Sequence, residues 1–264
     1  MADKNVKGKS KRSSRLLTFL LVIFAAVFIG SGFMLGKEML QSKKEKDAFE
    51  QMNSELEKAV ESAEYEDKSP EELTLEHYAK IKEQNKDFVA WISIPGTPLS
   101  YPVMHTPGNT EYYLRRAFDG SYAVSGTPFL GEGCDVNSTN VLIYSHRMNN
   151  DTMFTPLLDY AKKDFWQEHK QIRFDTTDKL QTYEVVAAFY IDIPTSEDTD
   201  AFRWYNYSGD ISGEVFTDYV SRIKACAYYD TGIEVNEGDK LITLTTCAYN
   251  DETQRFVVVA KLVQ

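Results

Sequence analysis

The chain has 264 residues, is 42% hydrophobic and carries a formal net charge of −11. This length allows one good-sized core with some additional segments. Positive charge is concentrated at the N-terminus, where residues 1–15 contain six Lys or Arg against Asp3 alone, so the remainder is strongly acidic. Such a body has no basic groove for a phosphate backbone, which makes nucleic acid a poor partner.

Residues 16–36 are an unbroken run of 21 uncharged and mostly apolar residues. About 20 such residues in a helix cross a hydrocarbon core of about 30 Å. A cleaved signal peptide is the closest alternative, but its apolar region is usually shorter, and an A-x-A-like cleavage site is missing. The sequence therefore predicts an uncleaved signal anchor at 16–36, with the basic tail 1–15 in the cytoplasm and the rest outside the cell membrane.

Residues 37–68 are dense in Lys and Glu and contain apolar residues spaced three or four apart: Phe49, Met52, Leu56, Val60 and Ala63. This spacing predicts a helical stalk, although a partly disordered charge run fits the stretch nearest the membrane equally well. A second helix is predicted from Ser69, which can cap it and form a capping box with Glu72, while Pro70 suits the first helical position. Its buried side is expected to comprise Leu73, Tyr78 and Ile81.

From Asp87 onward the hydrophobic pattern becomes that of strands separated by Gly, Pro and Asn turns. Eight strands are predicted, at 88–94, 99–104, 126–130, 140–146, 171–175, 180–193, 239–247 and 254–263. Eight strands in about 180 residues suit a closed or nearly closed barrel, which leaves few exposed edges. Amphipathic helices are predicted at 152–169 and 213–229. The expected globular domain spans 69–264 and is mainly β.

The chain has three cysteines, Cys134, Cys226 and Cys247. An odd number in an exported chain leaves at least one thiol free or paired with another chain, and a Cys134–Cys226 disulfide would spare Cys247. An unpaired thiol outside the cell risks oxidation, which favours a chemical task for Cys247.

A cysteine nucleophile needs a base, because a free thiol is only a few per cent thiolate at neutral pH. No histidine follows Cys247, which excludes the chain order of papain-like peptidases. His146 ends an apolar strand where a polar loop starts, so the strand would hold it at the barrel rim. His105, in a turn beside a strand end, remains an alternative. His77 and His169 lie in predicted helices, and His169 is expected to be solvated.

Arg255 follows Cys247 by eight residues and begins the last strand. Such an arginine is usually a surface residue, but beside a nucleophile its guanidinium could stabilise an oxyanion or hold a peptide carbonyl. A short hairpin loop would bring the two residues together. No CxxC or HxxxH spacing is present, so neither a metal nor another cofactor is expected.

The segment "TLTTC" followed by Arg255 resembles the TLxTC…R signature of sortases, the membrane-anchored cysteine transpeptidases of Gram-positive bacteria, and "IYSHRM" resembles the segment with their histidine. "DFVAWISIPGTPLSYPVM", "YYLRRAFDG" and "YDTGIEVNEGDKLITLTTC" point to class B, over roughly residues 70–264. Ser145 departs from the glycine usual before the histidine. The resemblance implies an eight-stranded sortase barrel with N-terminal helices and a helix between strands six and seven, at 213–229.

The same resemblance implies a catalytic group of His146, Cys247 and Arg255. Cys247 would attack a threonine carbonyl in a C-terminal sorting motif of a surface protein, of the NPxTN or (S/N)PxTG kind. A peptidoglycan amine would then resolve the thioester, with His146 transferring protons and Arg255 steadying the substrate and oxyanion. Further residues expected to contact the substrate are Thr245, Thr246, Tyr205 and Tyr207, the last two from an aromatic cluster that can grip a proline-kinked peptide.

Two alternatives remain open on the sequence. A cysteine endopeptidase would share these residues and differ only in letting water resolve the thioester. A non-catalytic, membrane-tethered binding barrel would keep Cys247 as a structural residue, buried and slow to alkylate.

Overall fold

The computed structural model describes residues 7–61, 68–195, 197–247 and 253–264; the side chain of Cys247 is outside the described part. Contacts divide the chain into two compact units, Met1–Lys44 and Glu45–Gln264. The division lies inside the predicted stalk, so the compact C-terminal unit begins before the boundary at residue 69 that the sequence indicates. The predicted stripe residue Ala63 lies outside the described residues.

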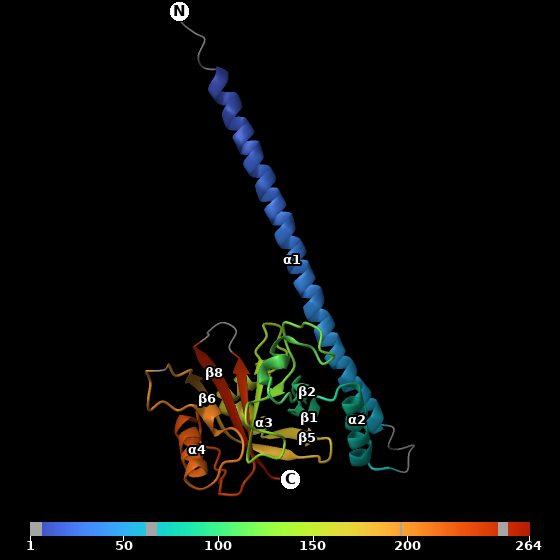
Figure 1. Cartoon of the computed structure of the whole chain (residues 1–264), viewed down its shortest axis with the longest axis vertical. Coiled ribbons are helices and arrows are strands. Elements are labelled where there is room, and N and C mark those ends of the chain that lie inside the picture. Colours follow the sequence, from blue (N-terminus) through green and yellow to red (C-terminus); the bar gives the residue numbers. More distant parts are fainter. Residues whose placement is uncertain (1–6, 62–67, 196, 248–252) are drawn as a thin grey trace, which may run out of the picture. The chain divides into compact units, whose positions relative to one another are not determined.

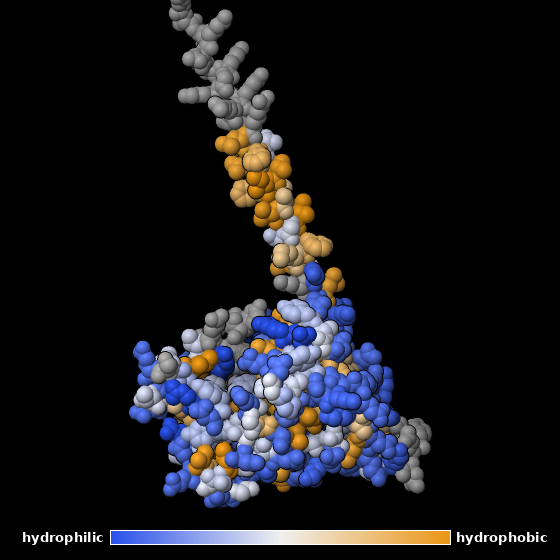
Figure 2. All heavy atoms as spheres, in the orientation of Figure 1, coloured by the Kyte–Doolittle hydropathy of each residue, from blue (hydrophilic) through white to orange (hydrophobic). Residues whose placement is uncertain are grey.

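The first helix, α1 (Lys7–Glu61), is continuous through the predicted membrane segment and most of the predicted stalk (Figure 1). Its segment from Leu16 contains one stretch that is long and apolar enough to cross a membrane. Large apolar side chains from Leu16 to Leu40 are exposed, and Figure 2 shows them as an orange band along α1. Length and composition therefore agree with the predicted span.

The last part of α1, from Glu45 to Glu61, packs on the barrel. Phe49 is buried with its ring centroid 5.2 Å from that of Tyr101, edge to face. Asn53 donates from Nδ2 to the carbonyl of Ser100 at 3.1 Å. The apolar stripe that predicts a helix here thus serves to dock that helix.

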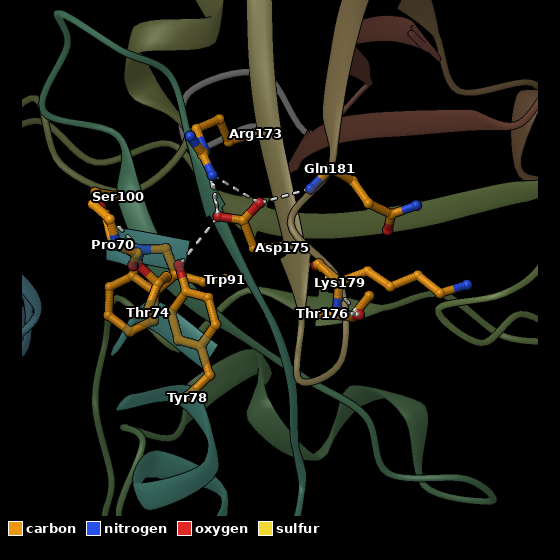
Figure 3. A network of polar contacts seen from close by, with 10 residues as sticks. All are labelled: Pro70, Thr74, Tyr78, Trp91, Ser100, Arg173, Asp175, Thr176, Lys179 and Gln181. Carbon is orange, nitrogen blue, oxygen red and sulfur yellow. Dashed lines mark hydrogen bonds and ion pairs between the residues drawn. The ribbon is translucent and has the colours of Figure 1, made fainter. Parts of the chain in front are cut away.

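Helix α2 (Pro70–Gln84) begins as predicted, with Ser69 and Glu72 forming both hydrogen bonds of the capping box. Its buried residues are the three expected ones, Leu73, Tyr78 and Ile81. The Tyr78 ring stacks at 6.1 Å on Trp91. Its hydroxyl donates to the buried Asp175 at 3.2 Å (Figure 3).

Asp175 is the centre of this polar network (Figure 3). Besides Tyr78, it contacts Arg173 in an ion pair at 3.2 Å and accepts a hydrogen bond from the backbone N–H of Gln181 at 2.9 Å. Burial raises the pKa of Asp175, and these partners oppose the rise. A buried carboxylate is tolerated only when paired in this way, so the network fixes α2 and the 175–181 turn to the barrel.

All eight predicted strands form and close into a barrel in the order β1-β2-β3-β4-β7-β8-β6-β5. Their bounds are β1 Phe88–Ser93, β2 Ser100–Met104, β3 Phe129–Leu130, β4 Asn140–His146, β5 Gln171–Thr176, β6 Thr182–Asp192, β7 Leu241–Cys247 and β8 Gln254–Leu262. Pairs are antiparallel except β2 with β3 and β4 with β7, which are parallel. The parallel β4–β7 pair requires a long crossover, and the segment between β6 and β7 contains a helix, as predicted.

Short helices fill the connections: η2 Thr110–Arg115, η3 Thr155–Ala161, α3 Lys163–Glu168, η4 Trp204–Tyr207 and α4 Gly213–Cys226. The single helix predicted at 152–169 is wrong, because Lys162 adopts an extended conformation and separates η3 from α3. The helix predicted at 213–229 ends three residues early. Its continuation turns to pair with β6, where the N–H of Tyr228 donates to the carbonyl of Ala188 at 3.1 Å.

Candidate active site

The parallel pairing of β4 with β7 brings His146 and Cys247 together. The register runs from Asn140 opposite Leu241 to His146 opposite Cys247, and both strands end at this pair. Neighbouring strands lie about 4.8 Å apart, so the two backbones are adjacent at one end of the barrel. These residues are 101 positions apart in sequence, and only the crossover makes them neighbours.

Arg255 reaches the same end on the next strand. In the antiparallel β7–β8 pair, Thr245 is opposite Val257, and two further residues along each strand lead to Cys247 and Arg255. The half-buried Arg255 donates from Nη1 to the carbonyl of Gln254 at 2.8 Å. The strands β4, β7 and β8 are consecutive in the barrel. Each of them thus contributes one of the three predicted catalytic residues at the same end of the barrel.

His146 is held in a defined tautomer. The residue is 8% exposed, and Nε2 lies 2.8 Å from the carbonyl oxygen of Leu114 in η2. A carbonyl can only accept, so Nε2 carries the proton of the neutral ring, and Nδ1 holds the lone pair that can act as a base.

The charge state of His146 follows from its surroundings. Burial lowers the pKa of His146, the Leu114 hydrogen bond raises it, and the nearby cations Arg115 and Arg255 lower it further. Because the net effect moves this pKa below the ordinary 6.5, the imidazole is mainly neutral at pH 7. A neutral, buried imidazole is suited to accept a proton from an acidic donor.

The alternative base, His105, lies in a different environment. The pKa of His105 is lowered mainly by burial, and the charges acting on it are those of Asp135, Lys82 and Asp87. Arg255 is not among them, whereas it does act on His146. The strand register also selects His146 as the histidine at the end of the strand beside Cys247.

The other two cysteines are free thiols in the structure, so the considered Cys134–Cys226 disulfide does not form. Cys134 is buried, and its Sγ contacts the carbonyl oxygens of Gly131 and Leu142 at 3.4 and 3.7 Å. Burial raises the pKa of both the Cys134 and the Cys226 thiols. Raised thiol pKa values disfavour the thiolate, which leaves Cys247 as the candidate nucleophile.

The two threonines before Cys247 are engaged within the protein. Thr245 is fully buried, and its Oγ1 accepts a hydrogen bond from Nε1 of Trp204 at 2.9 Å. Thr246 Oγ1 accepts from the backbone N–H of Phe256 at 3.1 Å. Their hydroxyls therefore connect β7 to η4 and to β8, rather than pointing into an open site.

The two predicted tyrosines differ in position. Tyr205 packs edge to face on Trp204 with ring centroids 5.1 Å apart, next to Thr245. The carbonyl of Tyr207 instead accepts from Asn140 Nδ2 at 2.8 Å, at the opposite end of β4 from His146. Asn140 precedes His146 by six residues on β4, which is about 20 Å along the strand. Four extended residues of a bound sorting motif would span only about 13 Å, which is too short to reach from His146 to Tyr207.

The structure thus places Tyr205 near the end of the barrel where β4 and β7 stop at His146 and Cys247, and it does not bring Tyr207 there. The hydroxyl of Tyr207 binds the carboxylate of Asp218 in α4. Its side chain lines a polar cavity of about 420 Å³ together with Arg203 and Arg222. Residue spacing alone could not separate the two tyrosines, because η4 contains both.

Sequence reasoning missed the carbonyl of Leu114 as the partner of His146. A backbone oxygen has no residue-type signal, and Leu114 lies 32 positions before the histidine. Within the described part of the chain, no group of three or more His, Cys, Asp or Glu side chains is arranged to hold a metal ion.

Comparison with known proteins decides the family. Residues 92–263 match the family model of the sortase domain. The chain belongs to the class B sortases. It is 27% identical to sortase B of Staphylococcus aureus (strain NCTC 8325 / PS 47) over 257 residues, covering 96% of this chain and 99% of that protein.

Solved structures of sortase B agree with this sortase in fold. The S. aureus sortase B–substrate complex superposes with a TM-score of 0.71 at 26% identity, covering 85% of this chain and 99% of that one. A crystal structure of sortase B complexed with triglycine gives a TM-score of 0.70 at 25% identity, with the same coverage. This sortase is accordingly a cysteine transpeptidase, and the predicted barrel and family are confirmed.

Proposed function

We propose that this sortase cleaves a Pro-containing C-terminal sorting motif of surface proteins after threonine and joins the new C-terminus to a peptidoglycan amine. The observation that carries the proposal is the register that places His146 opposite Cys247, with Arg255 on the adjoining strand. The motif is of the NPxTN or (S/N)PxTG kind, as the class B resemblance implies.

In the first half-reaction, Nδ1 of His146 takes the proton of the Cys247 thiol. The thiolate sulfur attacks the threonine carbonyl carbon, and Arg255 stabilises the resulting oxyanion and steadies the peptide. The C–N bond then breaks, the imidazolium gives its proton to the leaving amine, and a thioester remains on Cys247. The lowered pKa of His146 favours this donation, because the imidazolium is a stronger acid than an ordinary one.

In the second half-reaction, the accepting amine attacks the thioester carbon and loses a proton to His146. The C–S bond breaks and Cys247 returns as the thiol after recovering the proton. The solved sortase B complexes with a substrate and with triglycine support a peptide donor and an amine acceptor for this family. Tyr205 on Trp204 and the segment buried against Thr245 would form the wall that contacts the motif.

The proposed location is the outer face of the cell membrane. The apolar stretch of α1 would span the bilayer once, with the basic residues 1–15 in the cytoplasm and the barrel outside. Confinement to the surface where lipid-linked cell-wall precursor is present raises the effective concentration of both substrates. Protease added to intact protoplasts should remove the barrel and leave a short N-terminal fragment in the membrane; a fully protected chain would refute this topology.

The experiment that tests the reaction uses the full chain in detergent micelles and a fluorescence-quenched peptide containing NPxTN or (S/N)PxTG. Reactions with and without a peptidoglycan-stem amine are followed by mass spectrometry, with Cys247→Ala as the matched control. A ligated peptide and a thioester adduct that both require Cys247 support a transpeptidase. Hydrolysis that no cell-wall amine converts to ligation would establish the endopeptidase alternative. If no product depended on Cys247, the result would support the binding-barrel alternative.

A further inference from the structure

A buried carboxylate in α1 binds a loop that is distant in sequence. Glu45 is 7% exposed, although it follows a lysine in a highly charged stretch. Its two oxygens accept hydrogen bonds from the backbone N–H of Val124 at 3.3 Å, the N–H of Ser125 at 3.2 Å and the hydroxyl of Ser125 at 2.7 Å. Charge-assisted bonds of this kind are about twice as strong as neutral ones, so Glu45 anchors this turn firmly.

The anchored turn packs directly against η2, the 3-10 helix that holds His146. The N–H of Ala123 donates to the carbonyl of Arg115 and that of Thr127 to the carbonyl of Tyr113, both at 3.1 Å. Arg115 Nη1 donates back to the carbonyl of Val124 at 2.7 Å. Residues 123–127 therefore form hydrogen bonds with Tyr113 and Arg115, the residues directly before and after Leu114.

Gly126 completes the contact by close approach. It has φ of +63°, and a Cβ built on it would lie 2.5 Å from the carbonyl oxygen of Leu114 and 2.7 Å from that of Tyr113. The backbone of the turn thus touches the same Leu114 oxygen that accepts the His146 Nε2 proton at 2.8 Å. From Glu45 the path runs through Ser125 and Gly126 to Leu114 and His146 without a gap.

We propose that Glu45 is a positioning residue for the catalytic histidine. By fixing residues 124–126, its carboxylate keeps the Leu114 carbonyl where it selects the Nε2–H tautomer and orients Nδ1 of His146. The inference rests on the proposed function only in taking His146 as the acid and base of the reaction. It also makes the end of α1 part of the active-site support, although the sequence places the catalytic domain at 69–264.

The test compares variants of the full chain in detergent micelles. Glu45→Ala removes all three acceptor contacts, while Glu45→Gln keeps one oxygen able to accept from Ser125. Glu50→Ala is the matched control, because Glu50 is an exposed residue on the same helix whose ion pair with Lys46 is long, at 3.4 Å. Measurements are kcat and KM for the quenched sorting peptide, and the nitrogen chemical shifts of histidine-labelled protein with His146 assigned by His146→Gln.

We expect Glu45→Ala to lower kcat about 10-fold with KM within about twofold, since a small misplacement of a catalytic group costs rate rather than substrate binding. Glu45→Gln should recover part of the rate, and Glu50→Ala should match the unmodified chain. In Glu45→Ala, the Nδ1 and Nε2 shifts of neutral His146 should converge as both tautomers become populated.

A His146 spectrum and a kcat that are unchanged in Glu45→Ala would overturn the proposal. An equal loss in Glu50→Ala would also overturn it, because that would indicate a general effect of the helix. The spectrum does not depend on turnover. If the unmodified chain transferred no peptide while Glu45→Ala still altered the His146 tautomer, the proposed function would fail and the structural coupling would stand.

Discussion

Replacing Gly126 with alanine should damage catalysis out of proportion to stability. The new Cβ would lie 2.5 Å from the Leu114 carbonyl oxygen, and contacts under 3.0 Å essentially never occur, so backbone must move by about 0.5 Å or more. A shift of that size takes the 2.8 Å contact between this oxygen and His146 Nε2 to the limit of hydrogen bonding. We expect kcat for the quenched sorting peptide to fall about 10-fold.

Gly108→Ala is the matched control for this change. Gly108 has φ of +79°, also in the left-handed region, but nothing lies within 4 Å of a Cβ built there. Both variants therefore include about 1 kcal/mol of backbone strain, which lowers Tm by about 2–4 °C in a domain of this size. Only Gly126→Ala adds the clash, for a total of about 2–3 kcal/mol and a Tm about 4–12 °C lower.

The assay measures Tm by thermal unfolding and kcat at a temperature where each variant is fully folded. Gly108→Ala should retain full kcat. Equal kcat and equal Tm in the two variants would show that the turn yields without disturbing Leu114, and the assigned role of this backbone contact would be wrong.

Three further predictions follow from the site and its support. Alanine substitution of each of the three proposed catalytic residues should lower acyl transfer about 10³-fold or more, and double variants should lose little beyond single ones, as measured by peptide turnover. Tyr78→Phe removes the hydroxyl hydrogen bond to the buried Asp175 and should cost about 1.5–3 kcal/mol, seen as a Tm lower by about 3–12 °C; an unchanged Tm would contradict the network. Arg115→Gln removes a cation that lowers the pKa of His146, so an NMR titration should show this pKa rise. The folded-state pKa of His146 lies below its unfolded value of 6.5, so the unfolded chain binds more protons. The free energy of unfolding should therefore fall as the pH drops below about 6.5. In urea titrations, Arg115→Gln should show a smaller fall.

Local signals in the sequence determined the elements and the chemical groups. The capping box at Ser69 requires only residues three apart, and alternating apolar residues mark each strand, so both were predictable without tertiary information. The order of His146, Cys247 and Arg255 was likewise visible, because a nucleophile, a base and an oxyanion donor are recognised by residue type. The helix predicted at 152–169 was wrong because amphipathic spacing does not reveal the extended residue Lys162 that divides it.

Tertiary structure alone decided which of these groups meet. The parallel β4–β7 register, which depends on a crossover of nearly 100 residues and has no local signal, places His146 opposite Cys247. The contact of Glu45 with Ser125 joins residues 80 positions apart, and in sequence Glu45 is one of many charges in a predicted stalk. The physical reason is the same in both cases. Propensity and periodicity act over a few residues, whereas the burial of a carboxylate and the hydrogen bond to a backbone carbonyl are set by how distant segments pack.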